Sequence, residues 1–255
     1  DNYGIHARET FNLWPGNETV MGLDHDIASG EAKDVNPTTG TVSNELDETF
    51  RKTAPYALVS QEFDLAFCTL TPSAGVRWTD SRYFDDEPGY QAGLSAERGA
   101  TEIYANFAHA VNYPGIYAVN FYENFFQNAP PPVRPQPEDW KMIDPETMDH
   151  WELGVTQQLT EWSVFDISCY RDSVEDAFRL QQRPPQWLNV GSYTSEGVEA
   201  KLEMSPAENL ECFLGGNYTN TKDAKVPHAP EWSWSTGVSY KPIPRLTLHL
   251  DAEYT

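Results

Sequence analysis

The chain has 255 residues, with 17 Lys and Arg against 39 Asp and Glu, which gives a formal net charge of -22. A surface that binds nucleic acid needs clustered cations, so this acidic excess excludes that class of partner. The mean hydropathy is -0.59, and no apolar run approaches the ~20 residues of a membrane-spanning helix. A helical membrane protein is excluded, but a transmembrane β-barrel is not, because only alternate residues of its strands face lipid.

The sequence lacks the common motifs of catalytic and metal centres. It contains no Gly-rich phosphate loop, no His-x-His or His-Glu-x-x-His spacing and no Gly-x-Ser-x-Gly turn. The three cysteines, Cys68, Cys169 and Cys212, form no Cys-x-x-Cys pair, which argues against a disulfide framework or a zinc knuckle. We therefore expect no catalytic residue, no enzyme activity and no cofactor, with calcium as the one exception considered below.

Alternation of apolar and polar residues recurs along the chain and predicts β-strands. It is clearest in 197–204, where four apolar residues alternate with two glutamates and a lysine, and again in 246–255. Together with the flanking turn residues, the pattern predicts about twelve strands of roughly ten residues each, longer than the strands of most globular proteins. In chain order the predicted strands are 3–13, 18–27, 55–66, 70–79, 89–97, 101–112, 149–160, 163–172, 190–204, 210–220, 232–241 and 246–255.

The predicted connections alternate between two sizes. The short ones are 14–17, 67–69, 98–100, 161–162, 205–209 and 242–245, and the long ones are 28–54, 80–88, 113–148, 173–189 and 221–231. Outer-membrane barrels have short periplasmic turns at one end and long external loops at the other. The alternation therefore favours an antiparallel transmembrane β-barrel.

Aromatic residues stand where a barrel would meet the two membrane surfaces. Trp151 and Trp162 lie at opposite ends of one predicted hairpin, and Trp232 and Tyr240 at opposite ends of one strand. Trp and Tyr prefer the boundary between membrane and water, which agrees with a barrel. The alternative interpretation is that they are core aromatics of a soluble β-sandwich.

Two motifs in the second half of the chain carry a family resemblance. Asp144-Pro145-Glu146 precedes the predicted strand that begins near Trp151, and Asn189-Val190-Gly191 precedes Glu196-Gly197-Val198-Glu199. In this order and at this spacing they resemble the TonB-dependent outer-membrane receptors. Three further segments are similar to that family: Gly75-Val76-Arg77, Tyr104 to Phe107 leading to Pro114, and Pro227 with Pro230 ahead of a strand.

The resemblance implies a partial barrel and a transport function. The family's barrel has about 22 strands and a plugged lumen, so residues 1–255 would supply only its middle to C-terminal part. We expect the plug domain and the C-terminal closing strands to lie outside this chain. The chain would then be a fragment of a larger receptor or the product of a truncated gene, and a stand-alone twelve-stranded barrel is the third alternative. The implied function is energised uptake of a scarce, bulky nutrient, most often a ferric siderophore and otherwise cobalamin or haem. The implied partners are the TonB complex, reached through the plug, and the lipid and lipopolysaccharide of a Gram-negative outer membrane.

Specificity in such a receptor is expected in the external loops, where the ligand first meets the protein. The predicted loop 113–148 is rich in aromatic residues, which could stack on a planar chelate. The alternative is that they pack on one another and hold the loop folded. The candidate ligand-binding residues are Tyr117, Phe121, Tyr122, Phe125, Phe126 and Trp140.

Carboxylates gather in two of the long connections. Asp80, Asp85, Asp86 and Glu87 lie in the predicted loop 80–88. A second group, in the predicted loop 28–54, consists of Glu31, Asp34, Glu45, Asp47 and Glu48. Several carboxylates in one loop could bind calcium through their oxygens. The alternative is a solvated acidic loop, or one bridged by divalent ions to lipopolysaccharide phosphates.

Two function classes compete with the uptake receptor. A soluble, secreted β-sandwich that binds carbohydrate or mediates adhesion would need no detergent. A passive porin would need neither a plug nor a high-affinity ligand. The sequence leaves the identity of the ligand open.

Overall fold

The computed structural model describes residues 2–35, 37–115, 143–182, 185–222 and 230–255. All regular elements in these ranges are β-strands. No helix in the described part of the chain is long and apolar enough to cross a membrane. The strands are β1 (Asn2–Phe11), β2 (Asn17–Val35), β3 (Val42–Gln61), β4 (Phe63–Asp64), β5 (Thr69–Ser81), β6 (Glu87–Arg98), β7 (Thr101–Asn112), β8 (Glu146–Thr160), β9 (Ser163–Glu175), β10 (Phe178–Gln182), β11 (Pro185–Asn189), β12 (Tyr193–Ala207), β13 (Leu210–Lys222), β14 (Trp232–Ile243) and β15 (Leu246–Tyr254).

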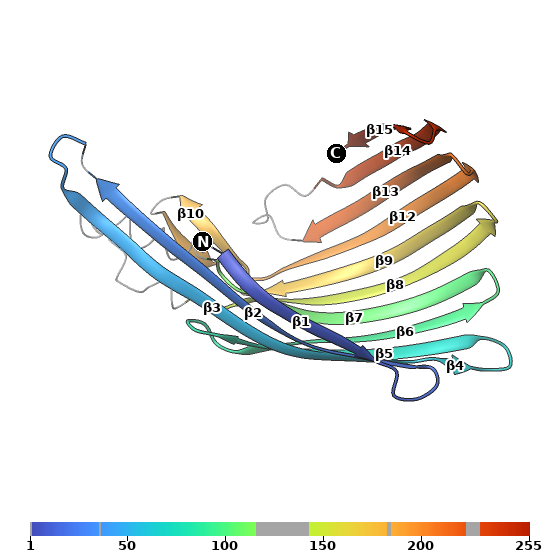
Figure 1. Cartoon of the computed structure of the whole chain (residues 1–255), viewed down its shortest axis with the longest axis horizontal. Helices are drawn as coiled ribbons and strands as arrows, with labels where there is room; N and C mark the ends of the chain where they lie inside the picture. Colours follow the sequence, from blue (N-terminus) through green and yellow to red (C-terminus); the bar gives the residue numbers. More distant parts are fainter. Residues whose placement is uncertain (1, 36, 116–142, 183–184, 223–229) are drawn as a thin grey trace.

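The strands form an antiparallel meander in which neighbours in sequence are neighbours in space. One 13-stranded sheet has the order β1-β2-β3-β5-β6-β7-β8-β9-β12-β13-β14-β15, with β4 paired to β5 beside this path. β10 and β11 pair only with each other and form a separate hairpin. β9 and β12, on either side of this hairpin in the sequence, therefore pair directly in the main sheet. Figure 1 shows the sheet curving into an open trough, with β1 at one edge and β15 at the other. The sheet does not close, as expected for part of a larger barrel.

The register sorts side chains onto two faces, because residues paired across an antiparallel sheet point to the same side. One row of paired residues, on what we call the apolar face, is Leu94, Ala105, Leu153, Cys169 and Val198. The row next to it, on what we call the polar face, is Ser95, Tyr104, Gly154, Ser168 and Glu199. The strand alternation predicted from the sequence is therefore confirmed in three dimensions.

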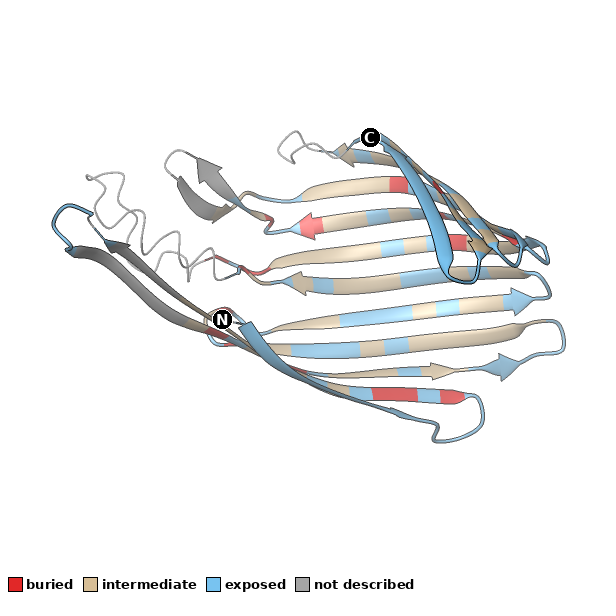
Figure 2. Cartoon of the chain, turned by 45° about the horizontal axis from the view of Figure 1, so that its top comes forward, coloured by how far each residue is buried: buried red, intermediate tan, exposed pale blue. Residues whose placement is uncertain are grey.

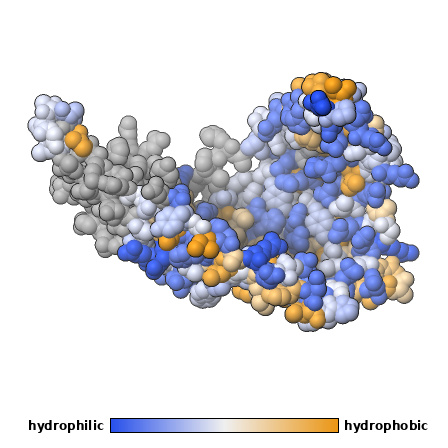
Figure 3. Space-filling view, viewed as in Figure 1, coloured by the Kyte–Doolittle hydropathy of each residue, from blue (hydrophilic) through white to orange (hydrophobic). Residues whose placement is uncertain are grey.

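The apolar face is exposed over most of the sheet. Leu153 is 54% exposed, Leu250 74% and Tyr254 69%. Figure 2 shows few buried residues along the sheet, and in Figure 3 apolar side chains gather along its outer margin. A soluble protein rarely exposes so large an apolar surface, so this face requires an apolar environment.

All twelve predicted strands are present, but two predicted loops are wrong in part. β2 continues to Val35 and β3 begins at Val42, so most of the predicted loop 28–54 is a two-stranded ribbon. β1 reaches only Ala28 on β2, and β5 reaches only Lys52 on β3. The ribbon therefore extends beyond the rest of the sheet, as Figure 1 shows. This part of the ribbon needs no apolar face, so its sequence does not alternate between apolar and polar residues.

The predicted loop 173–189 also contains secondary structure, since it holds the β10–β11 hairpin. Smaller corrections affect the ends of strands. The predicted strand 55–66 ends at Gln61 and gives way to the short β4, and the predicted strand 190–204 begins later, at Tyr193. The asymmetry between the two ends of the sheet is confirmed. Short turns, such as Gly99-Ala100 with φ +62° at Gly99, connect one end, and the long connections lie at the other.

Candidate functional site

The six aromatic residues predicted to bind ligand lie outside the described residues. They are Tyr117, Phe121, Tyr122, Phe125, Phe126 and Trp140. Their role stays a prediction. The described residues that could form a site lie at the base of the long connections and on the polar face of the sheet.

An aromatic cluster forms the base of the long connections. Phe50 from β3, Phe84 from the connection 82–86 and Ile143 from the end of the connection 113–145 are buried together. The ring centroids of Phe50 and Phe84 are 5.4 Å apart, and those of Phe84 and Tyr113 are 6.3 Å apart. Tilted ring pairs at these distances add to the stabilisation from burial. The cluster thus ties the connections 82–86 and 113–145 to each other and to β3.

Tyr113 is the polar anchor of this cluster. Its hydroxyl accepts a hydrogen bond from the backbone N–H of Glu87 at 3.1 Å and lies 3.3 Å from the carbonyl oxygens of Thr79 and Asp85. Burial, and then the negative charges nearby, raise the pKa of the Tyr113 phenol. No motif in the sequence singles out this residue, although an aromatic directly before Pro114 at a strand end is a signal that could have indicated it.

The four predicted calcium ligands lie close together in sequence, but no metal-binding group is formed among the described residues. Asp80 lies near the end of β5, Asp85 and Asp86 lie in the connection, and Glu87 begins β6. No three His, Cys, Asp or Glu side chains in the described part of the chain are grouped to hold a metal ion. The Asp86 carboxylate instead accepts a hydrogen bond from the backbone N–H of Ser81 at 3.3 Å. Calcium binding by this loop stays a prediction.

The second acidic group is placed differently from the prediction. Its residues lie on the paired strands of the β2–β3 ribbon, where Glu31 is opposite Asp47 and Glu45 is opposite Lys33. An extended ribbon gives these residues a fixed backbone register rather than the freedom of a loop.

A charged network occupies the polar face on β1, β2 and β5. The Arg77 Nη1 donates to Asp24 Oδ2 at 2.6 Å, while His6 Nδ1 lies 3.0 Å from Asp24 Oδ1. The Arg77 guanidinium also lies over the Tyr56 ring, 5.5 Å from its centroid. A carboxylate on one side and a ring beneath hold the planar guanidinium in one orientation.

Beside this network the polar face is hollowed. A pocket of about 460 Å³ has Arg8, Tyr56, Arg77 and Gln91 among its lining residues. Two arginines therefore line one concavity in a chain of net charge -22. Guanidinium N–H groups and an aromatic ring are suited to anionic, ring-containing ligands.

The family of the chain follows from a match along its whole length. The family model described as TonB dependent receptor-like, beta-barrel matches residues 1–255. The chain belongs to this family.

Solved structures agree with that assignment at the level of the fold. The siderophore receptor PirA from Pseudomonas aeruginosa is 19% identical with a TM-score of 0.66, over 99% of this chain and 45% of its own. A ferric enterobactin receptor (PfeA) mutant from Pseudomonas aeruginosa, in complex with enterobactin, is 16% identical with a TM-score of 0.68, over 99% and 41%. The copper transporter OprC is 15% identical with a TM-score of 0.67, over 94% and 40%. The chain thus spans less than half the length of these proteins.

Membership of the TonB-dependent receptor family indicates what each face of the sheet contacts. In transmembrane barrels the apolar face contacts lipid and the polar face lines the lumen, so we refer to them below as the lipid-facing and lumen-facing sides. The family comprises outer-membrane receptors and transporters rather than enzymes. It also favours the uptake receptor over the soluble β-sandwich and the passive porin.

Proposed function

We propose that the protein takes up a ferric siderophore through the outer membrane of a Gram-negative bacterium, with energy supplied through TonB. The observation that carries the proposal is the match of residues 1–255 to the barrel of TonB-dependent receptors. Siderophore receptors among the similar structures support iron chelates as the substrate class. Because the chain spans only 41–45% of those two receptors, its substrate and its coupling are inferences from its family.

The pocket on the lumen-facing side supports an anionic ligand. Ferric complexes of catecholates carry net negative charge and expose flat aromatic rings. Arg8 and Arg77 would supply charge-assisted hydrogen bonds, and Tyr56 an aromatic contact. Asp24 fixes one edge of the Arg77 guanidinium, so the rest of its N–H groups are presented with little loss of side-chain entropy on binding.

The proposed transport sequence has three stages. The aromatic residues of the connection 113–145 capture the chelate, the lumen-facing cations receive it, and movement of the plug by the TonB complex releases it inward. Residues of this chain contribute to the first two stages. The third depends on the plug and on TonB, which we place outside this chain.

Ligand binding by purified full-length protein tests the proposal. Tryptophan fluorescence titration with ferric catecholate, ferric hydroxamate, haem and cobalamin would compare the substrate classes. We expect saturable binding of a ferric siderophore, and about tenfold weaker binding after Arg77→Gln, because a charge-assisted contact is lost. Arg245→Gln removes a cation from the short turn before β15 and is the matched control. Absence of saturable binding to every ferric chelate would refute the proposed substrate class.

A further inference from the structure

The lipid-facing side carries a groove that the uptake function does not use. It has a volume of about 590 Å³ and runs across β6, β7, β8 and β9. Leu94, Ala105, Leu153 and Cys169 line its apolar part, and these residues form one row of the sheet register. The groove is thus a recess in the surface that contacts membrane lipid.

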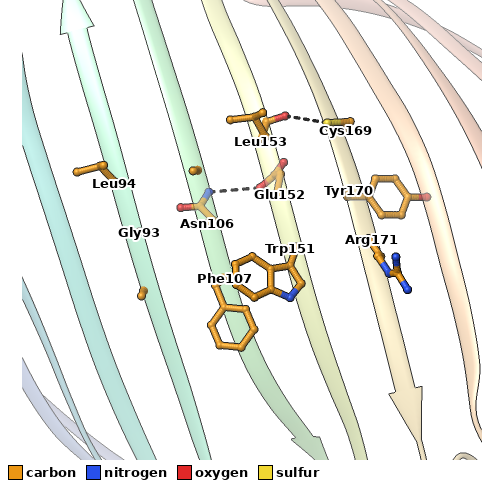
Figure 4. A pocket seen from close by; sticks show the side chains of 12 residues that line it. Gly93, Leu94, Asn106, Phe107, Trp151, Glu152, Leu153, Cys169, Tyr170 and Arg171 are labelled. Atoms are coloured by element: carbon orange, nitrogen blue, oxygen red, sulfur yellow. Dashed lines mark hydrogen bonds between the residues drawn. The ribbon is translucent and has the colours of Figure 1, made fainter.

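Two aromatic rings border the groove on the side of the long connections. Figure 4 shows Phe107 and Trp151 side by side, with Arg171 beyond Trp151. The ring centroids of Phe107 and Trp151 are 4.4 Å apart. Trp151 is 57% exposed, as expected for an indole at the membrane boundary.

A charged triad, which consists of Arg171, Glu196 and Lys222, adjoins the rings on the same side of the sheet. Arg171 is paired in register with Trp151 on one neighbouring strand and with Glu196 on the other, so Arg171 and Glu196 face lipid as Trp151 does. Arg171 Nη1 lies 3.4 Å from Glu196 Oε1, and Lys222 Nζ lies 2.8 Å from Glu196 Oε2. Two cations share one carboxylate, so the triad keeps a net positive charge in a strongly acidic chain.

The triad lies near the ends of its strands, where a transmembrane barrel meets the headgroup region of the bilayer. Arg171 is near the end of β9, and Lys222 is the last residue of β13, both at the end of the sheet with the long connections. Charged side chains are costly at the middle of a bilayer and far less so near its surface. The side chains of Arg171 and Lys222 remain 59% and 62% exposed, so their outer N–H groups are accessible.

Another carboxylate on this side of the sheet, that of Asp149, has a partner. Asp149 Oδ1 lies 2.6 Å from His109 Nδ1, and the Tyr90 ring stacks on that imidazole at 4.7 Å between centroids. Asp149 is thus paired with an imidazole, and Glu196 with two cations.

We propose that this groove and triad bind one phosphorylated, multiply acylated lipid of the outer leaflet. One acyl chain lies in the groove against Leu153 and Ala105, and a phosphate of the headgroup bonds to Arg171 and Lys222. Charge complementarity selects a phosphate, because a guanidinium bonds phosphate oxygens in pairs. The adjoining apolar recess selects a lipid over a free anion.

Native mass spectrometry of the detergent-solubilised full-length protein tests the proposal. The probes are bisphosphorylated lipid A, the same lipid without phosphates, and inorganic phosphate. We expect lipid A to bind, and Arg171→Gln with Lys222→Gln to weaken that binding about tenfold. Ala105→Trp, which fills the groove, should weaken it as well. Lys201→Gln, on the lumen-facing side of β12, should leave it unchanged.

Three results would overturn the proposal. They are unchanged lipid A binding in the Arg171/Lys222 double variant, equal binding of the phosphate-free lipid, and displacement of lipid A by inorganic phosphate alone at millimolar concentration. If the double variant fails to fold, as judged by heat-modifiable migration on a gel, Arg171→Lys with Lys222→Arg takes its place. That charge-preserving variant should bind lipid A, whereas Ala105→Trp should not. Loss of lipid A binding in both variants, or retention of binding in both, would refute the site. Siderophore binding does not enter these readouts, so failure here leaves the proposed uptake function standing.

Discussion

The side-chain amide of Asn189 forms two hydrogen bonds with the backbone of Asp144, 45 residues earlier in the chain. The Asp144 N–H donates to Asn189 Oδ1 at 3.0 Å, and Asn189 Nδ2 donates to the Asp144 carbonyl at 3.0 Å. Asn189 Nδ2 also donates to the Asp176 carbonyl. One side chain therefore joins the ends of two long connections.

Removing this amide should loosen both connections. We expect Asn189→Ala to leave the Asp144 backbone groups without partners, at a local cost of about 1–3 kcal/mol. Hydrogen exchange measured by mass spectrometry should show faster exchange in the peptide that contains Asp144. Asn209→Ala, in the short turn before β13, is the control, and equal exchange in both variants would contradict the role of Asn189.

Glycines opposite aromatic rings should tolerate no side chain. A Cβ at Gly154 would lie 2.3 Å from Cζ of Tyr104, which is paired with it in register. Gly154→Ala should therefore destabilise the sheet by about 1–3 kcal/mol through overpacking. A Cβ at Gly89 would meet nothing closer than 3.4 Å, so Gly89→Ala is the control. Urea unfolding followed by gel migration measures both, and equal midpoints would show that the Tyr104 ring moves aside at no cost.

Tyr113 should report on the base of the long connections. Tyr113→Phe keeps the ring but leaves the Glu87 N–H unpaired, so we expect faster hydrogen exchange at Glu87 with little change in β12 to β15. Tyr113→Ala should also loosen the packing around Phe84, because the ring contact is lost. Identical exchange at Glu87 in the wild type and Tyr113→Phe would contradict the hydroxyl's role.

Tyr113 should also make the stability of the folded protein fall at high pH. Since burial raises the folded-state pKa of Tyr113, its protonated form is favoured by folding. Its contribution to stability is fully present below the ordinary tyrosine pKa of about 10 and is lost as the pH rises through the folded-state pKa. Phenolate absorbance should show one fewer late-titrating tyrosine in Tyr113→Phe. A difference spectrum that titrates at or below about pH 10 would contradict the raised pKa.

The aromatic residues of the connection 113–145 should govern ligand capture. Replacing Tyr122, Phe125 and Phe126 together with Ala should weaken ferric siderophore uptake, because stacking contacts with the ligand are lost. Phe67→Ala, exposed at the end with the short turns, is the control. Unchanged affinity in the triple variant would reject their role.

The strands were predictable because one side of each strand contacts lipid and the other side faces the aqueous lumen. This difference imposes an alternation of apolar and polar residues on 198–204 and on 246–254, and both segments form strands in the structure, as predicted. The ends of β2 and β3 escaped prediction for the same reason. Beyond Ala28 the ribbon meets no lipid, and without that requirement its sequence resembles a loop.

The candidate site was less predictable, since its contacts join segments that are distant in sequence. The motifs around Asp144 and Asn189 were visible separately, but only the structure shows them bonded to each other. The cluster of Phe50, Phe84 and Tyr113 has no local periodicity, because one ring comes from β3 and the other two from different connections. The lipid-facing triad likewise depends on the register of three strands.

Uptake in cells tests whether the protein imports ferric siderophores with energy supplied through TonB. Full-length protein would be expressed in a strain that lacks its other siderophore receptors, with and without a functional TonB, and supplied with ⁵⁵Fe-labelled siderophores. We predict saturable accumulation of iron that requires both the protein and TonB. Entry that is unsaturable and independent of TonB, as through a passive pore, would contradict energised siderophore uptake by this protein.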